Sequence, residues 1–433
     1  MSELLGFGSD LPWWGWTLMG IGVIAIVGVI GALFFPDWPS DDHTTSFDAD
    51  PGSDSFVEGT AVFLNCPLFR GGGVTLLENG DAFFPAMLEA IRSARDSVNF
   101  ETYIFEPDQI GRQFIDAFKD RARAGVEVRF LLDGFGGIKM TKRYRKELQE
   151  AGVIVSRFRS FSLRNLVRFY RRTHRRAIVI DGRVGFTGGA AVSKKWKGNV
   201  SNRHEWRDSM TRVTGPMVSG IQSAFAGNWV YCTGEIIAGP RFFPRLDGGS
   251  GPCGLSVVSS PNDALQPIRL LFWISFTNAR RRLWICSSYF IPDRRLRDAV
   301  IDRARSGVDV RILVPGNQTD AVPVQAAGRS YYEELLASGV RIFEYEPAMM
   351  HAKTVTIDGA WSIIGSANLD ERSMEINEEN VLGIADQDFA KAIEEGVTAD
   401  FARSREILLE KWRKRPLIQR GLEACAKVLI EQY

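Results

Sequence analysis

The 433-residue chain has only four histidines and five cysteines. No two cysteines form a Cys-x-x-Cys pair, and all five are far apart, which argues against a disulfide framework and against a zinc site. Residues 11–36 contain no charged side chain, and residues 37–58 contain no lysine or arginine. With 45% hydrophobic and 24% charged residues, the composition excludes a chain that is disordered throughout and also excludes a collagen.

An excess of charge of either sign is lacking too, because 53 lysines and arginines face 52 aspartates and glutamates. That balance alone argues against a partner that is a polyanion. The charges are unevenly placed, however: residues 37–58 hold seven acids, whereas residues 157–176 hold eight arginines and no acid. Because apolar residues alternate with these arginines, the run favours an anionic membrane surface and lipid headgroups. A solvated basic face is the ordinary alternative, and nucleic acid also fits the charge.

The uncharged stretch predicts a membrane anchor. As a helix rising about 1.5 Å per residue, residues 11–36 would cross a hydrocarbon core of roughly 30 Å. Trp13, Trp14 and Trp16 precede the most apolar part and Trp38 follows it, as in an interfacial aromatic belt. A cleaved signal peptide is the weaker alternative, because no basic residue precedes the stretch. We therefore expect an N-terminal transmembrane helix within residues 1–36, a solvated acidic linker over 37–59, and folded sequence from about Thr60.

The rest of the chain consists of two similar copies of one sequence repeat. Residues 121–134, RARAGVEVRFLLDG, parallel residues 303–316, RARSGVDVRILVPG, and residues 173–189 parallel residues 350–366. Short apolar strands alternate with amphipathic helices in both copies, which predicts the α/β class. We expect two similar domains, 60–245 and 246–433, each a mixed β-sheet flanked by helices, with a Gly/Pro-rich seam at 245–254.

Both copies carry the same polar motif. It reads His174-Arg175-Arg176, Asp181-Gly182 and Gly188-Gly189 in the first copy, and His351-Ala352-Lys353, Asp358-Gly359 and Gly365-Ser366-Ala367-Asn368 in the second. His351 and Lys353 point to one side of an extended chain, and Asp-Gly predicts a hairpin that returns Ser366 and Asn368 beside them. An imidazole, a cation, a hydroxyl and an amide together indicate phosphate binding and nucleophilic chemistry.

Structural explanations differ for the histidines and the aspartates. Two of only four histidines head the same pattern in two copies, which core packing does not explain well. For Asp181 and Asp358, turn formation is a sufficient explanation, and a direct catalytic role is the weaker alternative.

With its paired HxK(x)4D-type motifs, each followed by GS or GG, the chain resembles the phospholipase D superfamily from about Thr60 onward. Segments such as FETYIFEPD and IGSANLDERSMEINEEN are similar to those of its bacterial cardiolipin synthase branch. The resemblance implies two domains about a pseudo-two-fold axis with one shared active site. It also implies a transferase of phospholipid biosynthesis that converts two phosphatidylglycerol molecules to cardiolipin and glycerol, at the bacterial inner membrane with its catalytic domains in the cytoplasm.

The resemblance further implies roles for individual residues. His174 would attack phosphorus to form a phosphohistidine, and His351 would serve as the acid and then the base. Asp208 and Glu379 match the carboxylates that the family places behind its histidines, although either could be an ordinary surface acid. Ser366, Asn368 and Gly189 would contact the substrate phosphate. Lys353 and Arg176 would neutralise that phosphate, so no metal and no other cofactor is expected.

Three departures from the family pattern lie in the first copy. Arg176 replaces a lysine, Ala191 replaces an asparagine, and Ser209-Met210 follows Asp208 where a histidine is common. A weakened enzyme, or a lipid-binding protein without activity, is therefore one alternative. A hydrolase that uses water as acceptor, on lipid or nucleic acid, is another, with nucleic acid disfavoured by the apolar N-terminal stretch. The tail over 410–433 predicts a basic amphipathic segment that lies on a bilayer or packs on the domain.

Overall fold

The computed structural model describes residues 12–34, 43–160, 170–261, 263 and 265–430, with the side chains of the first helix given from Trp13 to Ala25. The chain divides into two compact units, Met1–Ser46 and Phe47–Tyr433. The first unit contains α1 (Trp13–Phe34), so the apolar stretch is helical. Within the described part of the chain, no helix is long and apolar enough to cross a membrane. The predicted transmembrane anchor is therefore not supported.

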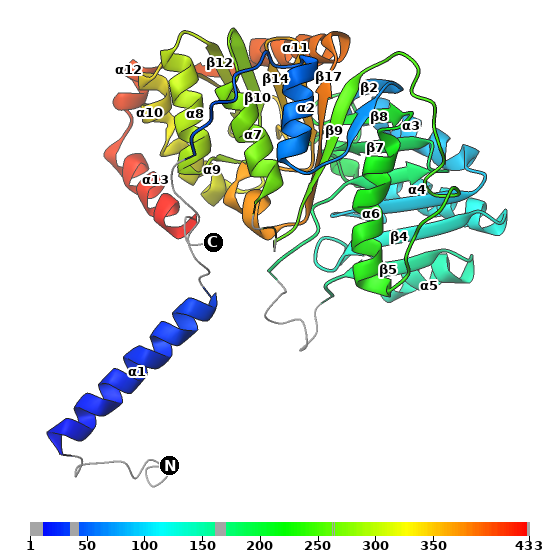
Figure 1. Cartoon of the computed structure of the whole chain (residues 1–433), viewed down its shortest axis with the longest axis horizontal. Helices are drawn as coiled ribbons and strands as arrows, with labels where there is room; N and C mark the ends of the chain where they lie inside the picture. The colour runs from blue at the N-terminus through cyan, green and yellow to red at the C-terminus, as the bar shows by residue number, and fades with distance from the viewer. Residues whose placement is uncertain (1–11, 35–42, 161–169, 262, 264, 431–433) are drawn as a thin grey trace. The chain divides into compact units, whose positions relative to one another are not determined.

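The first copy of the repeat forms a seven-stranded mixed sheet in the order β2-β8-β7-β6-β3-β4-β5 (Figure 1). Its strands are β2 (Gly73–Glu78), β3 (Ser97–Thr102), β4 (Glu127–Asp133), β5 (Ile154–Phe158), β6 (Ala177–Ile180), β7 (Val184–Gly188) and β8 (Ser209–Thr214). Only the neighbours β3, β4 and β5 run parallel. The other pairs are antiparallel.

The second copy repeats this order as β9-β17-β15-β14-β10-β12-β13 and adds one strand at each edge, β1 and β18. Its strands are β1 (Leu68–Arg70), β9 (Cys253–Ser259), β10 (Arg282–Cys286), β12 (Asp309–Pro315), β13 (Arg341–Tyr345), β14 (Thr354–Ile357), β15 (Trp361–Gly365), β17 (Glu379–Ala385) and β18 (Ser404–Ile407). A separate two-stranded ribbon joins β11 (Phe290–Ile291) to β16 (Leu369–Asp370). Two mixed α/β sheets of matching order confirm the predicted fold class, while the domain boundaries stay predictions.

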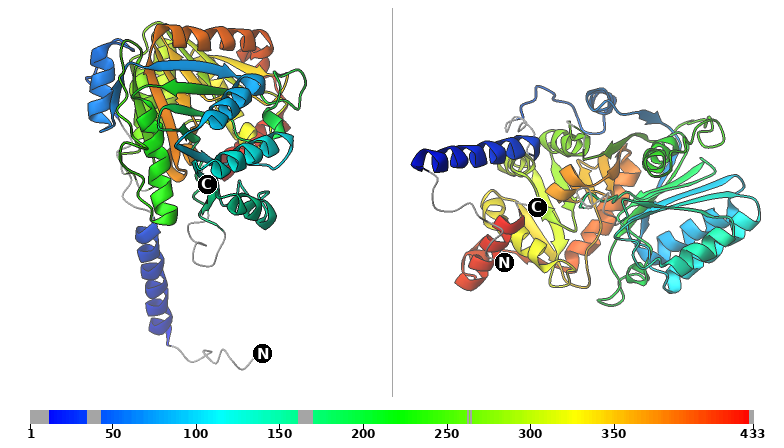
Figure 2. Two further views of the ribbon diagram at one scale, coloured as in Figure 1. Left: turned by 90° about the vertical axis from the view of Figure 1, so that its right-hand side faces the viewer. Right: turned by 90° about the horizontal axis from the view of Figure 1, so that it is seen from below.

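The helices form layers on either side of the sheets. They include α3 (Asn79–Ser93), α4 (Gln109–Arg123), α5 (Lys142–Glu150) and α6 (Val218–Thr233) in the first half, and α7 (Pro267–Thr277), α8 (Arg294–Arg305), α9 (Val322–Arg329), α10 (Tyr332–Ala337), α11 (Gln387–Ala402) and α12 (Leu409–Arg413) in the second. Helices α3 and α4 cover one face of the first sheet, and α7 and α8 cover one face of the second. Helices α6 and α11 contribute to a third core that both halves share. Figure 2 shows the two groups of strands next to each other.

Successive side chains of a strand point to opposite faces of the sheet, so each sheet contributes to two cores. In β6, Ile178 and Ile180 face the helices of the first half, whereas Ala177 and Val179 belong to the shared core. In β12, Ile312 packs in the core of the second half and Leu313 packs in the shared core. Both faces of each sheet are therefore buried, so the strands read as continuous apolar runs.

Folded structure begins earlier than the sequence predicted. Helix α2 (Asp54–Phe63) starts inside the expected linker, with Ser53 as its N-cap. Phe56 and Val57 are fully buried in the core of the second half, and β1 then pairs with β9. The prediction of a solvated linker as far as residue 59 is wrong for this helix, because two apolar side chains on one helical face outweigh the surrounding acids.

Candidate active site

The two motif histidines lie on extended segments that precede β6 and β14, and each segment pairs with the opposite half of the molecule. The His174 backbone N–H donates to Glu378 O at 2.8 Å, and the His351 backbone N–H donates to Arg207 O at 2.7 Å. Isolated parallel bridges at Thr173 and Met350 extend both contacts. The backbone therefore locks the two copies together at the point where their motifs meet.

Each imidazole also takes its carboxylate partner from the other copy. His174 Nδ1 lies 3.1 Å from Glu379 Oε2, and His351 Nδ1 lies 2.6 Å from Asp208 Oδ2. Glu379 and Asp208 are fully buried. Because an ionised carboxylate only accepts, each Nδ1 carries the proton of this hydrogen bond and leaves Nε2 as the nitrogen available to a ligand.

The carboxylates are themselves held in place. Ser366 Oγ donates to Glu379, while Trp196 Nε1 donates to Asp208 Oδ2 at 2.8 Å. A Cβ atom on Gly189 would lie 2.3 Å from Asp208 Oδ1, so only glycine leaves room for that carboxylate. Neither Ser366 nor Gly189 lines the cavity described below, so their contact with the substrate phosphate stays a prediction. Both lie behind the histidines, where the hydroxyl and the missing side chain position the acids.

The two motif cations differ in how they are held. The Arg176 guanidinium donates to the carbonyl of His174, and its Nε has no hydrogen-bond partner among the described residues. Lys353 Nζ donates to Ser288 Oγ and to the carbonyl of His351, both at 2.6 Å, and lies 3.2 Å from His351 Nδ1. Arg176 is on the wall of the cavity described below, whereas Lys353 lies behind His351.

Burial sets the protonation states of the site. It lowers the pKa of His174 to about 4, with Arg176 adding to the effect, and lowers the pKa of His351 to about 4, with Lys353 adding to it. Burial likewise lowers the pKa of Lys353 to about 7. Burial acts to raise the pKa of Asp208 and of Glu379, but the adjoining histidines outweigh it and both values fall below the ordinary one. At neutral pH the substrate-free site thus holds two neutral imidazoles and two carboxylates.

A cavity of about 300 Å³ opens in front of the histidines. Its walls are formed by side chains of both copies, namely Tyr103, Ile104, Arg172, His174, Arg176, Trp206, Tyr289, Asp320, His351, Asn368, Asp370, Arg372, Ser373 and Asn377. Asn368 Oδ1 is buried without a hydrogen-bond partner in the described structure, so it can bind a ligand hydroxyl. Among the described residues, no group of three or more histidine, cysteine, aspartate or glutamate side chains is placed to hold a metal ion.

Comparison with known proteins decides the family. The family model "Cardiolipin synthase, PLD-like domain" matches residues 87–205 and 274–401, which include both motifs. Cardiolipin synthase A of Pseudomonas fluorescens SBW25 is 37% identical over 361 residues, covering 83% of this chain and 75% of the relative. Cardiolipin synthase 2 of Bacillus anthracis is 34% identical over 358 residues, covering 82% of this chain and 69% of the relative. The chain belongs to the cardiolipin synthase family.

Solved structures agree on the fold. The crystal structure of phosphatidylserine synthase from Haemophilus influenzae Rd KW20 matches with a TM-score of 0.67 at 14% identity, covering 86% of this chain and 99% of that one. The family predicted from the paired motifs is confirmed, as is the arrangement of two phospholipase D-like domains.

Several residues of this cardiolipin synthase cavity were missed by sequence reasoning. Tyr103 and Tyr289 occupy the same place in the two copies, in FETYIF and CSSYFI, so the repeat itself held the signal. The Tyr103 ring centroid lies 5.2 Å from that of His174, and Tyr289 Oη donates to Asp320 at 2.8 Å. Asp320 follows β12 on a loop with no motif, and nothing in the sequence alone marked it.

Four of the eight arginines in the run over residues 157–176 lie inside the structure and not on a basic surface. Arg159, Arg172, Arg175 and Arg176 are all buried. Arg172 pairs with Asp133 at 3.4 Å, and both Arg175 and Arg159 pair with Glu378, at 3.0 and 3.5 Å. Arg159, Arg172 and Arg175 stabilise the base of the site because buried acids far away in the sequence neutralise them. Residues 161–169 lie outside the described structure.

The motif aspartates are turn residues. Asp181 and Asp358 have left-handed backbones, with φ of 53° and 55°, at the hairpins β6–β7 and β14–β15. Asp181 accepts hydrogen bonds from the backbone N–H groups of residues 95–97, and Asp358 accepts from those of residues 280–282. Each carboxylate thus ties a hairpin to the start of the neighbouring strand, β3 or β10, away from the cavity.

Proposed function

We propose that this protein is a cardiolipin synthase that converts two molecules of phosphatidylglycerol into cardiolipin and glycerol. The observation that carries the proposal is the pair of crossed histidine–carboxylate contacts on one cavity, in a chain of the cardiolipin synthase family. Two imidazoles with fixed tautomers supply a nucleophile and an acid–base group, which transfer through a covalent intermediate requires.

In the first step, Nε2 of His174 attacks the phosphorus of the donor lipid. A nitrogen–phosphorus bond forms, the bond from phosphorus to the headgroup glycerol oxygen breaks, and His351 gives that oxygen a proton. In the second step, His351 takes the proton from a hydroxyl of the acceptor headgroup, whose oxygen bonds to phosphorus and releases His174. Arg176 and Asn368 are placed to bind the non-bridging oxygens and the headgroup.

The acid step needs a proton that the empty site holds weakly. Lys353 Nζ lies 3.4 Å from Nε2 of His351, and the two groups compete for this proton, because burial lowers the pKa of both. A bound phosphodiester brings a negative charge into the cavity, which raises both pKa values. Substrate binding therefore prepares His351 to act as the acid.

The direct test is a lipid product assay. The membrane fraction that contains the protein is incubated with phosphatidylglycerol, and cardiolipin, phosphatidic acid and glycerol are measured by mass spectrometry. Wild type should form cardiolipin and glycerol in equal amounts, and His351→Ala should form neither. Phosphatidic acid as the main product would instead identify a hydrolase, and equal cardiolipin from His351→Ala would refute the mechanism.

We also propose that the enzyme works at the inner membrane of a bacterium, with the Phe47–Tyr433 unit on the cytoplasmic side. The supporting features are the apolar residues of α1 and the exposed Leu417, Ile418 and Leu422 of α13 (Leu417–Ile430). Fractionation of a variant that lacks residues 1–42 should show less membrane-bound protein, and protease added outside spheroplasts should leave the Phe47–Tyr433 unit intact. Full membrane binding by the shortened variant would reject attachment through α1.

A further inference from the structure

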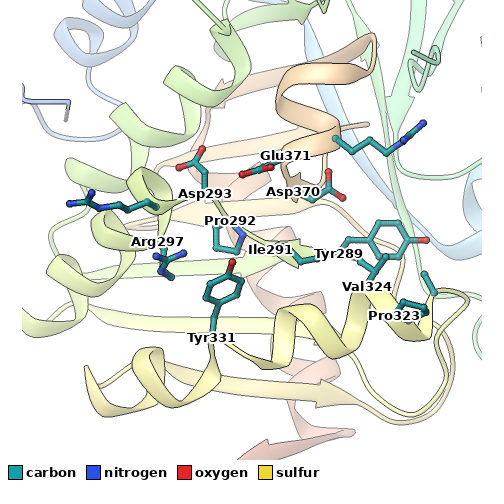
Figure 3. A pocket seen from close by; sticks show the side chains of 13 residues that line it. Tyr289, Ile291, Pro292, Asp293, Arg297, Pro323, Val324, Tyr331, Asp370 and Glu371 are labelled. Atoms are coloured by element: carbon teal, nitrogen blue, oxygen red, sulfur yellow. The ribbon is translucent and has the colours of Figure 1, made fainter. Parts of the chain in front are cut away.

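A second cavity, which we call the side pocket, adjoins the reaction cavity. It has a volume of about 620 Å³ and is formed entirely by residues between 289 and 372, all in the second copy. Ile291, Pro292, Pro323, Val324 and the ring of Tyr331 give it mainly apolar walls, as Figure 3 shows. A pocket of this size with this lining suits an apolar ligand.

The side pocket and the reaction cavity have three wall residues in common. Tyr289, Asp370 and Arg372 line both. A ligand that has its apolar end in the side pocket can therefore place its polar end in front of the histidines. An apolar site of this kind suits a reaction of two phospholipids, because the donor and the acceptor each carry a diacylglycerol group.

Charged groups also line the side pocket. Arg294 and Arg297 begin α8, while Asp293 caps that helix and pairs with Arg269 at 2.8 Å. Arg297 pairs with the half-exposed Glu334 at 3.1 Å, and its guanidinium lies over the Tyr331 ring. Arg294 pairs with the half-exposed Asp298 at 3.5 Å. Because the acids paired with both arginines are half-exposed, and the helix cap and Arg269 already engage Asp293, the two arginines can also bind a lipid phosphate that does not enter the reaction cavity.

We infer that the side pocket holds the diacylglycerol end of the acceptor phospholipid, with an acyl chain between β11 and α9. This inference rests on the proposed function. A donor phosphate lies between the two histidines, so the acceptor hydroxyl must approach on the side of His351, opposite the bond to His174. His351 and the side pocket both belong to the second copy, and His351 lines the reaction cavity together with the three shared wall residues.

The shared wall is suited to a glycerol headgroup. Asp370 stands between the two cavities, and Asp320, which accepts from Tyr289, lies beside it in the reaction cavity. Carboxylate oxygens accept hydrogen bonds from vicinal hydroxyl groups. An acceptor headgroup fixed there gives up its hydroxyl proton to His351 as the oxygen–phosphorus bond forms and the histidine–phosphorus bond breaks.

The test compares two reactions of the full-length enzyme. Cardiolipin formation needs a lipid acceptor, whereas exchange of isotope-labelled glycerol into phosphatidylglycerol needs the donor lipid and a small alcohol only. Val324→Trp fills the side pocket from α9, and Val322→Trp adds the same ring to an exposed position of the same helix, 65% exposed and off the pocket wall. Ala321→Phe is a second filling variant, in case Val324→Trp does not fold.

We expect the filling variants to slow cardiolipin formation by roughly tenfold or more, as loss of a few buried methylene groups predicts, with glycerol exchange close to wild type. Val322→Trp should leave both reactions unchanged. If exchange falls in parallel with cardiolipin formation at an unchanged melting temperature, the pocket serves the donor and the inference is overturned. Unchanged cardiolipin formation overturns it as well. Absence of cardiolipin from wild type would reject the proposed function itself, independently of these variants.

Discussion

At the scale of single residues, the two copies of the motif have become different parts of one site. Arg176 faces the cavity with its Nε unpartnered in the described structure, whereas Lys353 lies behind His351 and bonds to Ser288. A guanidinium keeps its charge at any ordinary pH, but a buried ammonium can lose its proton. Of the two motif cations, only Lys353 is therefore sensitive to pH in the neutral range.

This difference predicts the alkaline limit of activity. A lysine is charged below its pKa, so a site that needs the proton shared by Lys353 and His351 loses activity as pH rises through about 7. The profile of kcat/KM against pH should show that limb in wild type and a shift to higher pH in Lys353→Arg. An unchanged limb in this variant would assign it to another group.

A second prediction concerns the carboxylates behind the histidines. Asp208→Asn keeps the shape of the side chain but removes the acceptor that fixes the His351 tautomer, so cardiolipin formation should fall about 100-fold or more. Asp181→Asn, in a hairpin turn, should retain most activity. Both rates are measured alongside melting temperature, and a similar loss in both variants would indicate a general effect of charge removal.

The sequence showed these residues to different extents. Two histidines at matching places in a repeat were visible without a structure, as were the turns at Asp181 and Asp358. That each histidine pairs with a carboxylate of the other copy was not visible, because Asp208 and His351 are 143 residues apart and His174 and Glu379 are 205 apart. The buried arginines were misread for the same reason, since Asp133 and Glu378 neutralise them only in three dimensions.

At the scale of elements, α2 and β1 precede the first sheet in sequence but belong to the second. Phe56 packs edge-on against Trp361, with ring centroids 5.3 Å apart, and Phe47 stacks on Phe56 with ring centroids 5.9 Å apart. Asp54 and Glu58 pair with Arg70, and Asp48 and Asp50 pair with Arg280. The acids that suggested a free linker therefore meet cations that a one-dimensional reading could not assign to them.

This packing predicts a large effect of one substitution in α2. Phe56→Ala should lower the free energy of unfolding by about 3–5 kcal/mol, because the residue is fully buried among aromatic rings. Val62→Ala, on the same helix but 82% exposed, should change it by less than about 0.5 kcal/mol. Urea denaturation in detergent, followed by tryptophan fluorescence, measures both. Equal effects would mean that α2 does not dock on this core.

At the scale of the whole molecule, buried ion pairs join the copies next to each crossed carboxylate. Arg207, which precedes Asp208, pairs with Asp400 at 2.8 Å, and Glu378, which precedes Glu379, pairs with Arg175 at 3.0 Å. The fold class followed from the repeat because strand and helix periods survive in both copies. The core shared by the two halves did not follow, since a sequence does not show which face of one sheet packs against the other copy.

Breaking one such ion pair should lower the stability of the whole Phe47–Tyr433 unit. Arg175→Met leaves Glu378 buried with only the Ser260 hydroxyl and a longer ion pair to Arg159 as partners, so the free energy of unfolding should fall by about 3–5 kcal/mol. Arg341→Met removes an exposed pair with Glu406 and should cost about 1 kcal/mol or less. Chemical denaturation should show one transition for the Phe47–Tyr433 unit in both variants. Two separate transitions would show that the copies unfold independently.

The crossed contacts also bear on how such a protein can diverge. Two identical copies related by an exact two-fold axis could exchange carboxylates in the same way, but every change in one would appear in the other. Joining the copies in a single chain removes that constraint. One copy can then hold an arginine that keeps its charge, and the other can hold both a lysine that loses its charge and the pocket for the acceptor. The two substrates thereby take different places, because the donor and the acceptor each bind to a different half of the chain.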